Sequence, residues 1–550
     1  MAGKHLRYIL ILSVLSYFFL IFGNGLMSLT NPDEVFYAQT AKEMSEHRSW
    51  LTPYLFGAPQ FEKPVLLYWL VRAGFALFDN QSFAARFFPA LFGCFGVIAA
   101  YLLAVMGFHN EKKAFVSSLT LLSSGLYIGL SRTLFTDMIF SVFILFSLVS
   151  FYWGYSRKDR KGVGIVLFFI FSSLAVLTKG PLGFLIPSLI VLIFLSLRRD
   201  LGFLSCGYSL WGLGIFIAAA FPWYIFMISR YGASFTHEFF YNDHIRRLLT
   251  AEHAGNDTWY FYPYSMVGCM FPWSLFTLAA LIVLAMKLRR DRNAFSIFLV
   301  SWISVVFVIF QSAHSKLVSY VFPAFPALAI MTGDYVFDAA SSKSRSRIFY
   351  ILSIFMAAVL FAIPVAAIFL VPKYSSYLSS RTAPYAVIGL LFLFSALFLF
   401  FVLSRRLMKA IATLVFLIPA IWFIAPFAHR GIEPYISSKL ASEYLMQNHE
   451  VANPIVCSKF IARGVRYYTD KEIVVLGSPK DFFSPHPVTY LDSDKEVEDY
   501  LRDQKVTYCI LDKSSIERIK RAADKQFRLS VLKTIGDEYI LEITHGELMP

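Results

Sequence analysis

Acidic and basic side chains gather in a few short stretches of a chain that otherwise avoids charge. The stretch NPDEVFYA places Asp33 and Glu34 side by side, and EKPVLLYWL carries Glu62 and Lys63. A third stretch, SRTLFTDMIF, contributes Asp137. Each stretch lies next to a long apolar run, and ionisable groups at a membrane boundary are functional candidates by default.

Three later stretches of the same kind add mainly basic and aromatic groups. They read LTKGPLGFLIP, HEFFYNDHIRRLLTAEHAGNDTWYFYPY and QSAHSKLVSYVFPAFP, and they contribute Lys179, His244, Arg247, His253, Lys316 and Tyr320. Lysine and arginine bind phosphate groups, arginine with two parallel hydrogen bonds. A carboxylate can take a proton from an attacking hydroxyl group. Together these groups predict the transfer of a group from a phosphate-linked donor.

Each of these residues also has a purely structural reading. Asp137 could stabilise the start of a helix through the helix dipole. Lys179 could be a turn residue or a lysine that reaches the membrane interface. Arg247 could contact lipid headgroups, His253 could be an interfacial histidine, and Tyr320 could belong to an aromatic belt. The argument for a site depends on their occurrence together.

The elements that must position these residues are predicted to cross a membrane. Of 550 residues, 57% are hydrophobic and 16% are charged, whereas soluble proteins are about a quarter charged. At roughly 20 apolar residues per span, the chain holds about thirteen candidates: 7–27, 84–107, 114–130, 133–153, 163–178, 181–197, 207–229, 260–286, 294–311, 316–337, 347–371, 384–404 and 408–428. The first is interpreted as an uncleaved helix.

The basic residues predict the orientation of the spans. With a cytoplasmic N-terminus, every second connection is a basic cluster, such as RKDRK or KLRRDR, as the positive-inside rule requires. The net charge of +14 is therefore attributed to topology, and no nucleic-acid partner is expected. All the stretches with candidate site residues fall on the outer face. Because no nucleotide donor is available there, a lipid-linked donor is the natural inference.

The chain is predicted to have two domains. Residues 1–428 form a transmembrane domain whose first outer loop, 28–83, carries the catalytic motif. From 429 to 550 no span remains, and short strand-like runs such as NPIVCSKF and EIVVLG alternate with helical runs such as DKEVEDYLRDQ. This pattern predicts a small periplasmic α/β domain, in which no catalytic motif is found. The fold class is mainly α, a bundle of membrane helices with an α/β domain at the C-terminus.

The motifs together resemble a known family. NPDEVFYA, EKPVLLYWL, SRTLFTDM, LTKGPLGFLIP and HSKLVSYVFPAFPAL are similar to those of the GT-C glycosyltransferases. The branch that these motifs resemble most is the bacterial aminoarabinose transferases that modify lipid A, which are related to the protein O-mannosyltransferases. The resemblance implies an inverting transfer of a sugar from undecaprenyl phosphate, or another polyprenyl phosphate, to an acceptor at the periplasmic face of the inner membrane, most simply lipid A.

The resemblance also implies roles for individual residues. Asp33 is the expected general base or acceptor-orienting carboxylate, with Glu34 and Asp137 as further catalytic acids. The donor phosphate is assigned to Lys63, Arg247 and Lys179. Tyr37, Tyr320, Lys316 and His253 are expected to line the cavity. Glu62 and His244 could share a divalent metal ion, although no cofactor is firmly implied.

The sequence departs from the family pattern in ways that leave the sugar and acceptor open. The family often has arginine at the position of Phe36, and KPV with Val65 replaces the common KPP. A protein O-mannosyltransferase is therefore an alternative within the same class of enzyme. A transporter or flippase is an alternative of another class. It is disfavoured because the charges cluster at one boundary and the halves show no repeat, whereas transporters bind at the midplane.

Overall fold

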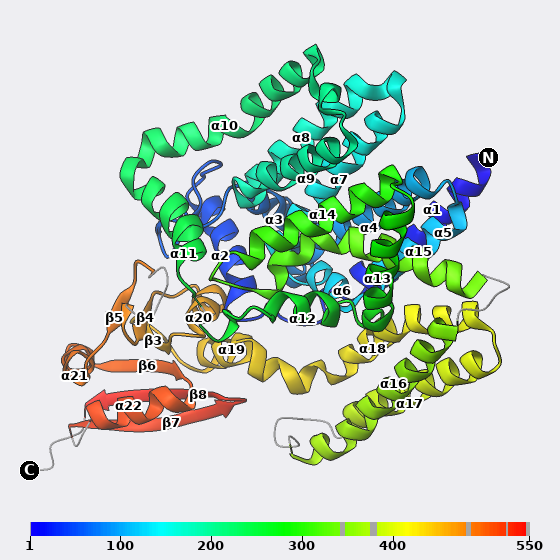
Figure 1. The fold of residues 1–550 in the computed structure, drawn as a ribbon. Helices are drawn as coiled ribbons and strands as arrows, with labels where there is room; N and C mark the ends of the chain where they lie inside the picture. Colours follow the sequence, from blue (N-terminus) through cyan, green and yellow to red (C-terminus); the bar gives the residue numbers. More distant parts are fainter. Residues whose placement is uncertain are drawn as a thin grey trace, which may run out of the picture.

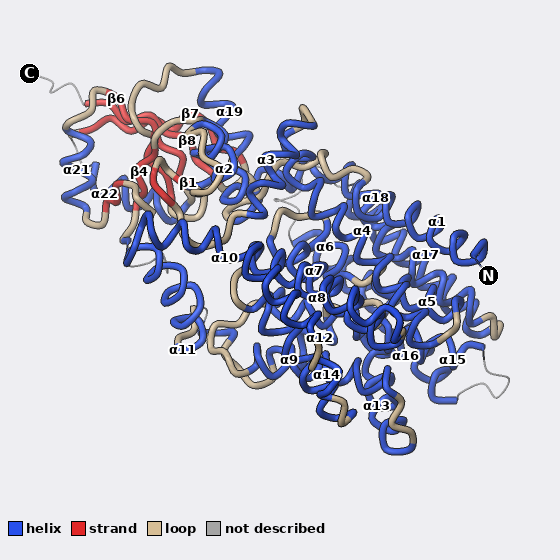
Figure 2. The backbone as a smooth tube through the Cα atoms, turned by 90° about the horizontal axis from the view of Figure 1, so that it is seen from above, coloured by secondary structure: helices blue, strands red, loops and turns tan. Residues whose placement is uncertain are grey.

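A computed structural model describes residues 2–252, 254–341, 347–373, 382–479, 486–523 and 526–545, without the side chains of 2–4, 382–383 and 424–430. A large helical bundle occupies one part of the molecule and a sheet with flanking helices the other, joined by the long helix α18 (Leu407–Ile436) (Figure 1). Seen from above, the two parts lie side by side along the length of the molecule (Figure 2). The expected fold class is confirmed.

The bundle begins with elements that surround the first outer segment. The expected loop 28–83 is in fact folded: it holds a helix, a two-stranded hairpin and a second helix. The bounds are α1 (Ala2–Ser16), α2 (Asp33–Glu46), β1 (Tyr54–Leu55), β2 (Ala58–Pro59), α3 (Leu66–Leu77), α4 (Gln81–Phe108), α5 (Glu111–Leu122), α6 (Gly125–Ser131) and α7 (Thr136–Ser156). The Asn80 side chain caps α4, and the Asn110 side chain caps α5, as short polar residues do at helix starts.

The remaining bundle helices follow in the order expected from hydropathy. They are α8 (Lys161–Lys179), α9 (Leu182–Arg198), α10 (Gly207–Thr236), the π-helical segment η4 (His237–Arg246), α11 (Arg247–Leu249), α12 (Phe261–Gly268), α13 (Ser274–Arg290), α14 (Ala294–Gln311), the 3-10 segment η6 (Val318–Ala324), α15 (Phe325–Ser341), α16 (Arg347–Lys373) and α17 (Thr382–Leu403). The expected span 260–286 is divided between α12 and α13.

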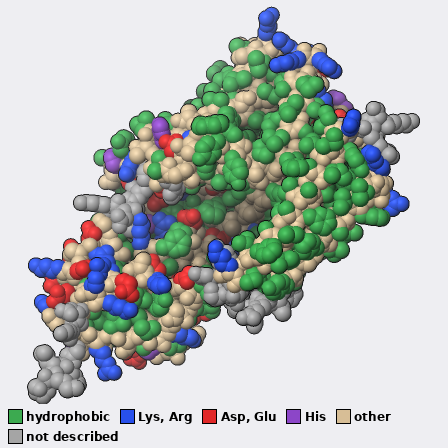
Figure 3. Space-filling view, turned by 60° about the horizontal axis from the view of Figure 1, so that its bottom comes forward, with side chains coloured by type: hydrophobic (Ala, Val, Ile, Leu, Met, Phe, Trp, Pro, Cys, Tyr) green, Lys and Arg blue, Asp and Glu red, His purple; other side chains and the backbone are tan. Residues whose placement is uncertain are grey.

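Length and composition identify a multi-pass membrane protein. Within the described residues, eight helices are long and apolar enough to cross a membrane, or nine if the pair α5 and α6, bent by 65°, forms one span. Shorter apolar helices overlap further expected spans, among them His5–Ile21 and Leu182–Arg198. Exposed apolar side chains cover a broad face of the bundle (Figure 3), as contact with lipid requires. The count of about thirteen spans stays a prediction.

The C-terminal region forms a mixed sheet in the order β5-β4-β3-β6-β8-β7. Parallel pairing joins the first four strands, and β8 pairs antiparallel with both β6 and β7. The strands are β3 (Ile455–Ser458), β4 (Ile473–Leu476), β5 (Thr489–Leu491), β6 (Val506–Leu511), β7 (Phe527–Ile535) and β8 (Glu538–His545), with helices α19 (Lys439–Asn448), α20 (Ala462–Thr469), α21 (Asp494–Arg502) and α22 (Lys513–Ala523). The α18 helix runs through the boundary expected at residue 428.

Candidate functional site

The outer loop residues meet at a cavity of about 460 Å³ between the bundle and the C-terminal region. Figure 3 shows it as a hollow with charged side chains inside, beside the apolar face of the bundle. Its charged lining comprises five carboxylates and four cations: Asp33, Glu62, Asp137, Asp243, Glu252, Lys63, Lys179, Arg247 and Arg463. This concentration of charge in one concave space marks it as the candidate active site.

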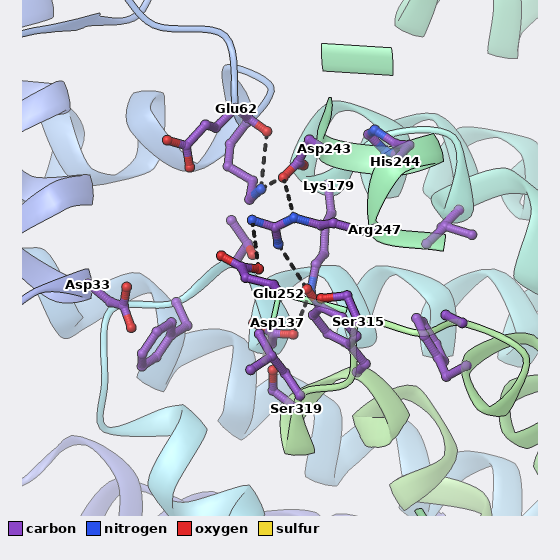
Figure 4. Close-up of a pocket in the computed structure, with 18 of the residues that line it drawn as sticks. Asp33, Glu62, Asp137, Lys179, Asp243, His244, Arg247, Glu252, Ser315 and Ser319 are labelled. Carbon is purple, nitrogen blue, oxygen red and sulfur yellow. Dashed lines mark hydrogen bonds and ion pairs between the residues drawn. The ribbon is translucent and has the colours of Figure 1, made fainter. Parts of the chain in front are cut away.

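Asp33 and Glu34, adjacent at the start of α2, have opposite environments. Asp33 faces the cavity, and its side chain is 55% exposed. Burial against the surrounding protein raises the pKa of Asp33, and the nearby Arg463 opposes that rise. Figure 4 shows Asp33 on one side of the space and the other ionic groups across from it. A carboxylate with a raised pKa and open space before it suits a general base.

Glu34 points into the protein and does not line the cavity. Its two oxygens accept hydrogen bonds from Arg86 at 2.7 and 2.5 Å, and one also accepts from the backbone N–H of Leu134 at 2.8 Å. Although burial opposes it, this pairing lowers the pKa of Glu34, which is therefore ionised. Arg86 also donates to backbone carbonyls of the segment before α2, at Asn24 and Met27. The expected catalytic role of Glu34 is thus replaced by a structural one: it anchors the helix end that presents Asp33.

Lys63 and Arg247 converge on one carboxylate, that of Asp243. The Lys63 Nζ donates to Asp243 Oδ2 at 2.7 Å, and the Arg247 Nε lies 3.3 Å from Asp243 Oδ1. Arg247 also donates to the Tyr320 hydroxyl at 2.9 Å and pairs with Glu252 at 3.3 Å. Figure 4 shows Asp243, Arg247 and Glu252 grouped at the middle of the space. The arrangement holds two cations where they can contact one phosphate group.

A second ion pair joins α7 to the end of α8. The Lys179 Nζ donates to Asp137 Oδ1 at 2.6 Å, and it lies 4.9 Å from the centre of the Tyr320 ring. Asp137 stands in the first turn of α7, at the positive end of the helix dipole. The structural and functional readings of Asp137 are therefore compatible, since the same carboxylate also faces the cavity.

His244 lies in η4, and its ring faces the turn after Lys179. The Nδ1 atom of His244 bonds the Phe239 carbonyl oxygen at 2.7 Å and so is the donor, which leaves Nε2 unprotonated in the neutral ring. Gly180 has φ of 103°, and a Cβ there would approach Nε2 to 2.7 Å, so the turn requires glycine. Isolated π-helical turns often occur at functional sites.

The pair Glu62 and His244 does not by itself make a metal site. Burial raises the pKa of Glu62, opposed by Arg463 and Lys63, which favours a protonated carboxyl that is a poor metal ligand. The described residues contain no group of three or more histidine, cysteine, aspartate or glutamate side chains able to hold an ion. The assignment of a metal to Glu62 and His244 stays a prediction, and no step is derived through it.

Most of the expected site residues line this one cavity, whereas Glu34 and Lys316, both described, do not. Tyr37 and Tyr320 line it, together with the expected acids and cations other than Glu34 and Lys316. Lys316 instead donates to Asp257 Oδ1 at 2.9 Å and to the Thr258 carbonyl at 3.2 Å, which fixes the loop before α12. His253 lies outside the described residues.

Sequence reasoning missed lining residues that no local pattern distinguishes. Asp243 and Glu252 stand near Arg247 in the same charged stretch, so their charge was visible but not their role. Arg463 comes from α20, a helix that was not expected, in the domain where no functional motif was found. Its guanidinium lies 4.6 Å from the centre of the Phe36 ring. A cation from the C-terminal region thus lies against Phe36, the position at which the resemblance led us to expect an arginine.

Comparison with known proteins gives the same picture. Residues 6–237 match the family model for dolichyl-phosphate-mannose-protein mannosyltransferase. An uncharacterised protein of Aquifex aeolicus is 29% identical, over 82% of this chain and 84% of its own. An undecaprenyl phosphate-aminoarabinose arabinosyl transferase of Pseudomonas fluorescens is 30% identical, over 56% of this chain, and the match spans 52% of that relative.

Solved structures extend the likeness to the whole fold. The crystal structure of ArnT from Cupriavidus metallidurans bound to undecaprenyl phosphate superposes with a TM-score of 0.78 at 18% identity, covering 98% of both chains. The oligosaccharyltransferase of Archaeoglobus fulgidus superposes with a TM-score of 0.53 at 13% identity, covering 96% of this chain and 69% of its own. The expected resemblance is confirmed: the chain is similar in sequence to the aminoarabinose transferases and to the protein mannosyltransferase family, and it has the fold of the GT-C glycosyltransferase ArnT.

Proposed function

We propose that this protein is a glycosyltransferase that moves a sugar from an undecaprenyl-phosphate donor to lipid A. The observation that carries the proposal is the cavity, where Lys63, Lys179 and Arg247 gather opposite the Asp33 carboxylate. The curated relatives that act on an undecaprenyl phosphate sugar, and a neighbour crystallised with undecaprenyl phosphate, identify the class of donor. Aminoarabinose is the sugar those relatives' names support.

The residues of the cavity have separate parts in this reaction. Lys63 and Arg247 bind the donor phosphate and stabilise the negative charge that develops as it leaves. The acceptor oxygen attacks the anomeric carbon, the bond from that carbon to the phosphate oxygen breaks, and its electron pair leaves with undecaprenyl phosphate. Asp33 takes the proton of the acceptor. Attack opposite to the leaving phosphate inverts the configuration at the anomeric carbon.

The proposal includes an orientation in the membrane. The first of the basic connections expected on the cytoplasmic side, with Lys112 and Lys113, lies at the end of α4 away from Asp33. The positive-inside rule then places the N-terminus in the cytoplasm and the cavity, with the C-terminal domain, in the periplasm of a bacterial inner membrane. The division into domains at 1–428 and 429–550 belongs to the same proposal, adjusted to the end of α18.

A protein O-mannosyltransferase is the second candidate. The observation that favours it is the match of residues 6–237 to the mannosyltransferase family model. That stretch includes Asp33, Lys63, Asp137 and Lys179, the groups that would act on any polyprenyl-phosphate sugar. The two candidates share the donor chemistry and differ in the acceptor.

The test is mass spectrometry of lipid A from a bacterial host that lacks its own aminoarabinose transferase. We expect expression of the chain to add a sugar-sized mass, and Asp33→Asn to abolish it. Asp334→Asn is the matched control, because Asp334, like Asp33, is an aspartate with a cationic partner, but it lies outside the cavity. Unmodified lipid A, with all three proteins present in the membrane, would contradict the lipid A assignment. New glycopeptides in the same cells would then support the second candidate.

A further inference from the structure

Helix α20 of the C-terminal domain docks directly on α2, the helix that begins at Asp33. Lys42 pairs with Asp470, Arg466 lies 3.8 Å from Glu43, and the Tyr468 hydroxyl donates to the Leu29 carbonyl at 3.1 Å. The two helices are also adjacent in the ribbon view (Figure 1). The domain is therefore seated beside the start of α2 by contacts on several sides.

The approach of the two elements is close at Gly464. A Cβ added there would come to 2.0 Å from the Asn31 Oδ1 atom. Asn31 is held in turn by its backbone N–H, which donates to the Ile436 carbonyl at 2.8 Å, and by its side chain, which donates to the Ser438 Oγ at 2.7 Å. The segment just before Asp33 is thus packed against the domain rather than merely near it.

One side chain of α20 passes from this docking surface into the cavity. Among the described residues that line the cavity, Arg463 alone belongs to the C-terminal domain. Its guanidinium stacks on Phe36, and its Nη1 lies 3.9 Å from the Asp33 Oδ1. Its Nε donates to the His486 Nε2 at 3.0 Å. An aromatic ring on one side and a histidine on another fix the direction of the guanidinium toward Asp33.

His486 is suited to hold this arginine. Burial, together with Arg463, lowers the pKa of His486 to about 3, so the ring is neutral at neutral pH and its Nε2 can accept the hydrogen bond. The ring lies 5.1 Å from that of Phe56, next to the first outer hairpin. The backbone N–H of His486 donates to the Tyr490 hydroxyl at 2.9 Å.

We propose that the C-terminal domain completes the active site by placing Arg463 against Asp33, so that Arg463 is the positioning residue of the catalytic base. The inference rests on the proposed function. Burial, and after it the carboxylates of Glu252, Asp137 and Glu34, raise the pKa of Asp33, whereas Arg463 lowers it. Arg463 is the cation that keeps Asp33 ionised and directed at the acceptor. The domain then has a catalytic consequence beyond its contribution to the fold.

The test compares two arginines of the same helix in the purified full-length protein. Arg463→Gln removes the cation at Asp33, whereas Arg466→Gln removes one that contacts Glu43 and the Asp470 carbonyl at the docking surface. The measurement is kcat/KM for transfer from an undecaprenyl-phosphate aminosugar to lipid A as a function of pH. Binding of undecaprenyl phosphate and the thermal midpoint of unfolding are measured in parallel.

Loss of a neighbouring opposite charge shifts a carboxyl pKa by about 1 to 3 pH units. We expect Arg463→Gln to move the acid limb of the profile upward by at least about one unit, with undecaprenyl phosphate binding unchanged. Arg463→Lys restores part of that shift, because it keeps the charge but not the planar stacking on Phe36. Arg466→Gln leaves the acid limb where it is in the wild-type profile.

The possible outcomes separate the two proposals. A wild-type protein that transfers no sugar would overturn the proposed function and this inference together. An active wild-type protein whose acid limb does not move in Arg463→Gln would overturn the inference alone. Equal losses in Arg463→Gln and Arg466→Gln, with a lowered thermal midpoint in both and no shift of the limb, would reduce Arg463 to a docking contact.

Discussion

Two clusters of ion pairs lie at opposite ends of α4, whose 28 residues span about 42 Å. One is the cavity cluster around Lys63, Asp243 and Arg247. The other, which we call the far cluster, consists of Lys113, Lys287, Asp334 and Asp338. There Lys113 lies 2.6 Å from Asp334 and 2.8 Å from Asp338, and Lys287 lies 2.8 Å from Asp334. By charge and distance alone, the two clusters are alike.

The two clusters differ in the volume of the open space beside them. The hollow beside the far cluster has a volume of about 10 Å³, which is room for a single water molecule at most. The active-site cavity has about 460 Å³, and Asp33 faces it with the Arg463 Nη1 atom 3.9 Å away. The far cluster joins α5, α13 and α15 and leaves no room for a ligand. Ion pairing alone therefore does not identify a site, whereas charge that borders an open volume does.

The largest effect is expected at the carboxylate that faces the open volume. Asp33→Asn keeps the shape of the side chain but cannot accept a proton, so we expect kcat to fall by about 10² to 10⁴. Binding of undecaprenyl phosphate is expected to stay within about twofold, because Lys63 and Arg247 remain. Single-turnover transfer and a direct binding assay measure the two quantities. Full activity of Asp33→Asn would contradict the assignment of Asp33 as the catalytic base and of the cavity as the active site.

Replacement of the neighbouring carboxylate, Glu34, should lower the stability of the protein and leave the catalytic step unchanged. Glu34→Gln leaves Arg86 as a buried charge without its ionic partner, and breaking a buried pair costs about 3 to 5 kcal/mol. We expect a lower thermal midpoint and less folded protein in the membrane. The folded fraction should keep a pH profile like that of the wild type. A Glu34→Gln protein that is stable but inactive would contradict this prediction and support a catalytic role for Glu34.

Two lysines offer a matched pair across the clusters. Lys63 and Lys113 each lie within 2.7 Å of an aspartate oxygen, and both side chains are mostly buried. A charge-assisted hydrogen bond contributes about 1.5 to 3 kcal/mol, so Lys63→Ala should weaken undecaprenyl phosphate binding by about 10- to 100-fold. Lys113→Ala should not change it. Equal binding by both variants would mean that the donor phosphate does not contact Lys63.

The smallest effect is expected in the far cluster. Asp334→Asn removes one of two carboxylates, and Asp338 still partners both lysines, so we expect a loss of about 1 kcal/mol in stability and no change in transfer. Thermal unfolding and the lipid A assay measure both. A loss of transfer in Asp334→Asn, with the fold retained, would show that the far cluster is coupled to the cavity and would break the comparison.

The sequence was most informative where a signal is local. Apolar runs marked helices such as α4 and α14, because a chain in lipid must satisfy its own backbone hydrogen bonds. The alternation of strands and helices marked the C-terminal α/β fold. The charged stretches supplied most of the cavity's ionic groups, since charge next to an apolar run is rare unless it serves a function.

Other features depended on contacts between distant segments. Asp33 and Glu34 are identical in charge and adjacent in sequence, yet successive residues of a helix point about 100° apart, so one faces the cavity and the other Arg86. The sequence pattern did not predict helix α20, because a helix of only eight residues shows little periodicity. Its place beside α2 follows from packing.

The sequence by itself determined that this is a membrane protein with a set of outer acids and bases suited to phosphate-linked transfer. Only the tertiary structure decided which of those charges share a volume, which are neutralised by a buried partner, and that Arg463 joins them from the other domain. The physical reason is that residue types set chemistry and periodicity, whereas the distance between charges is set by how helices far apart in the chain pack together.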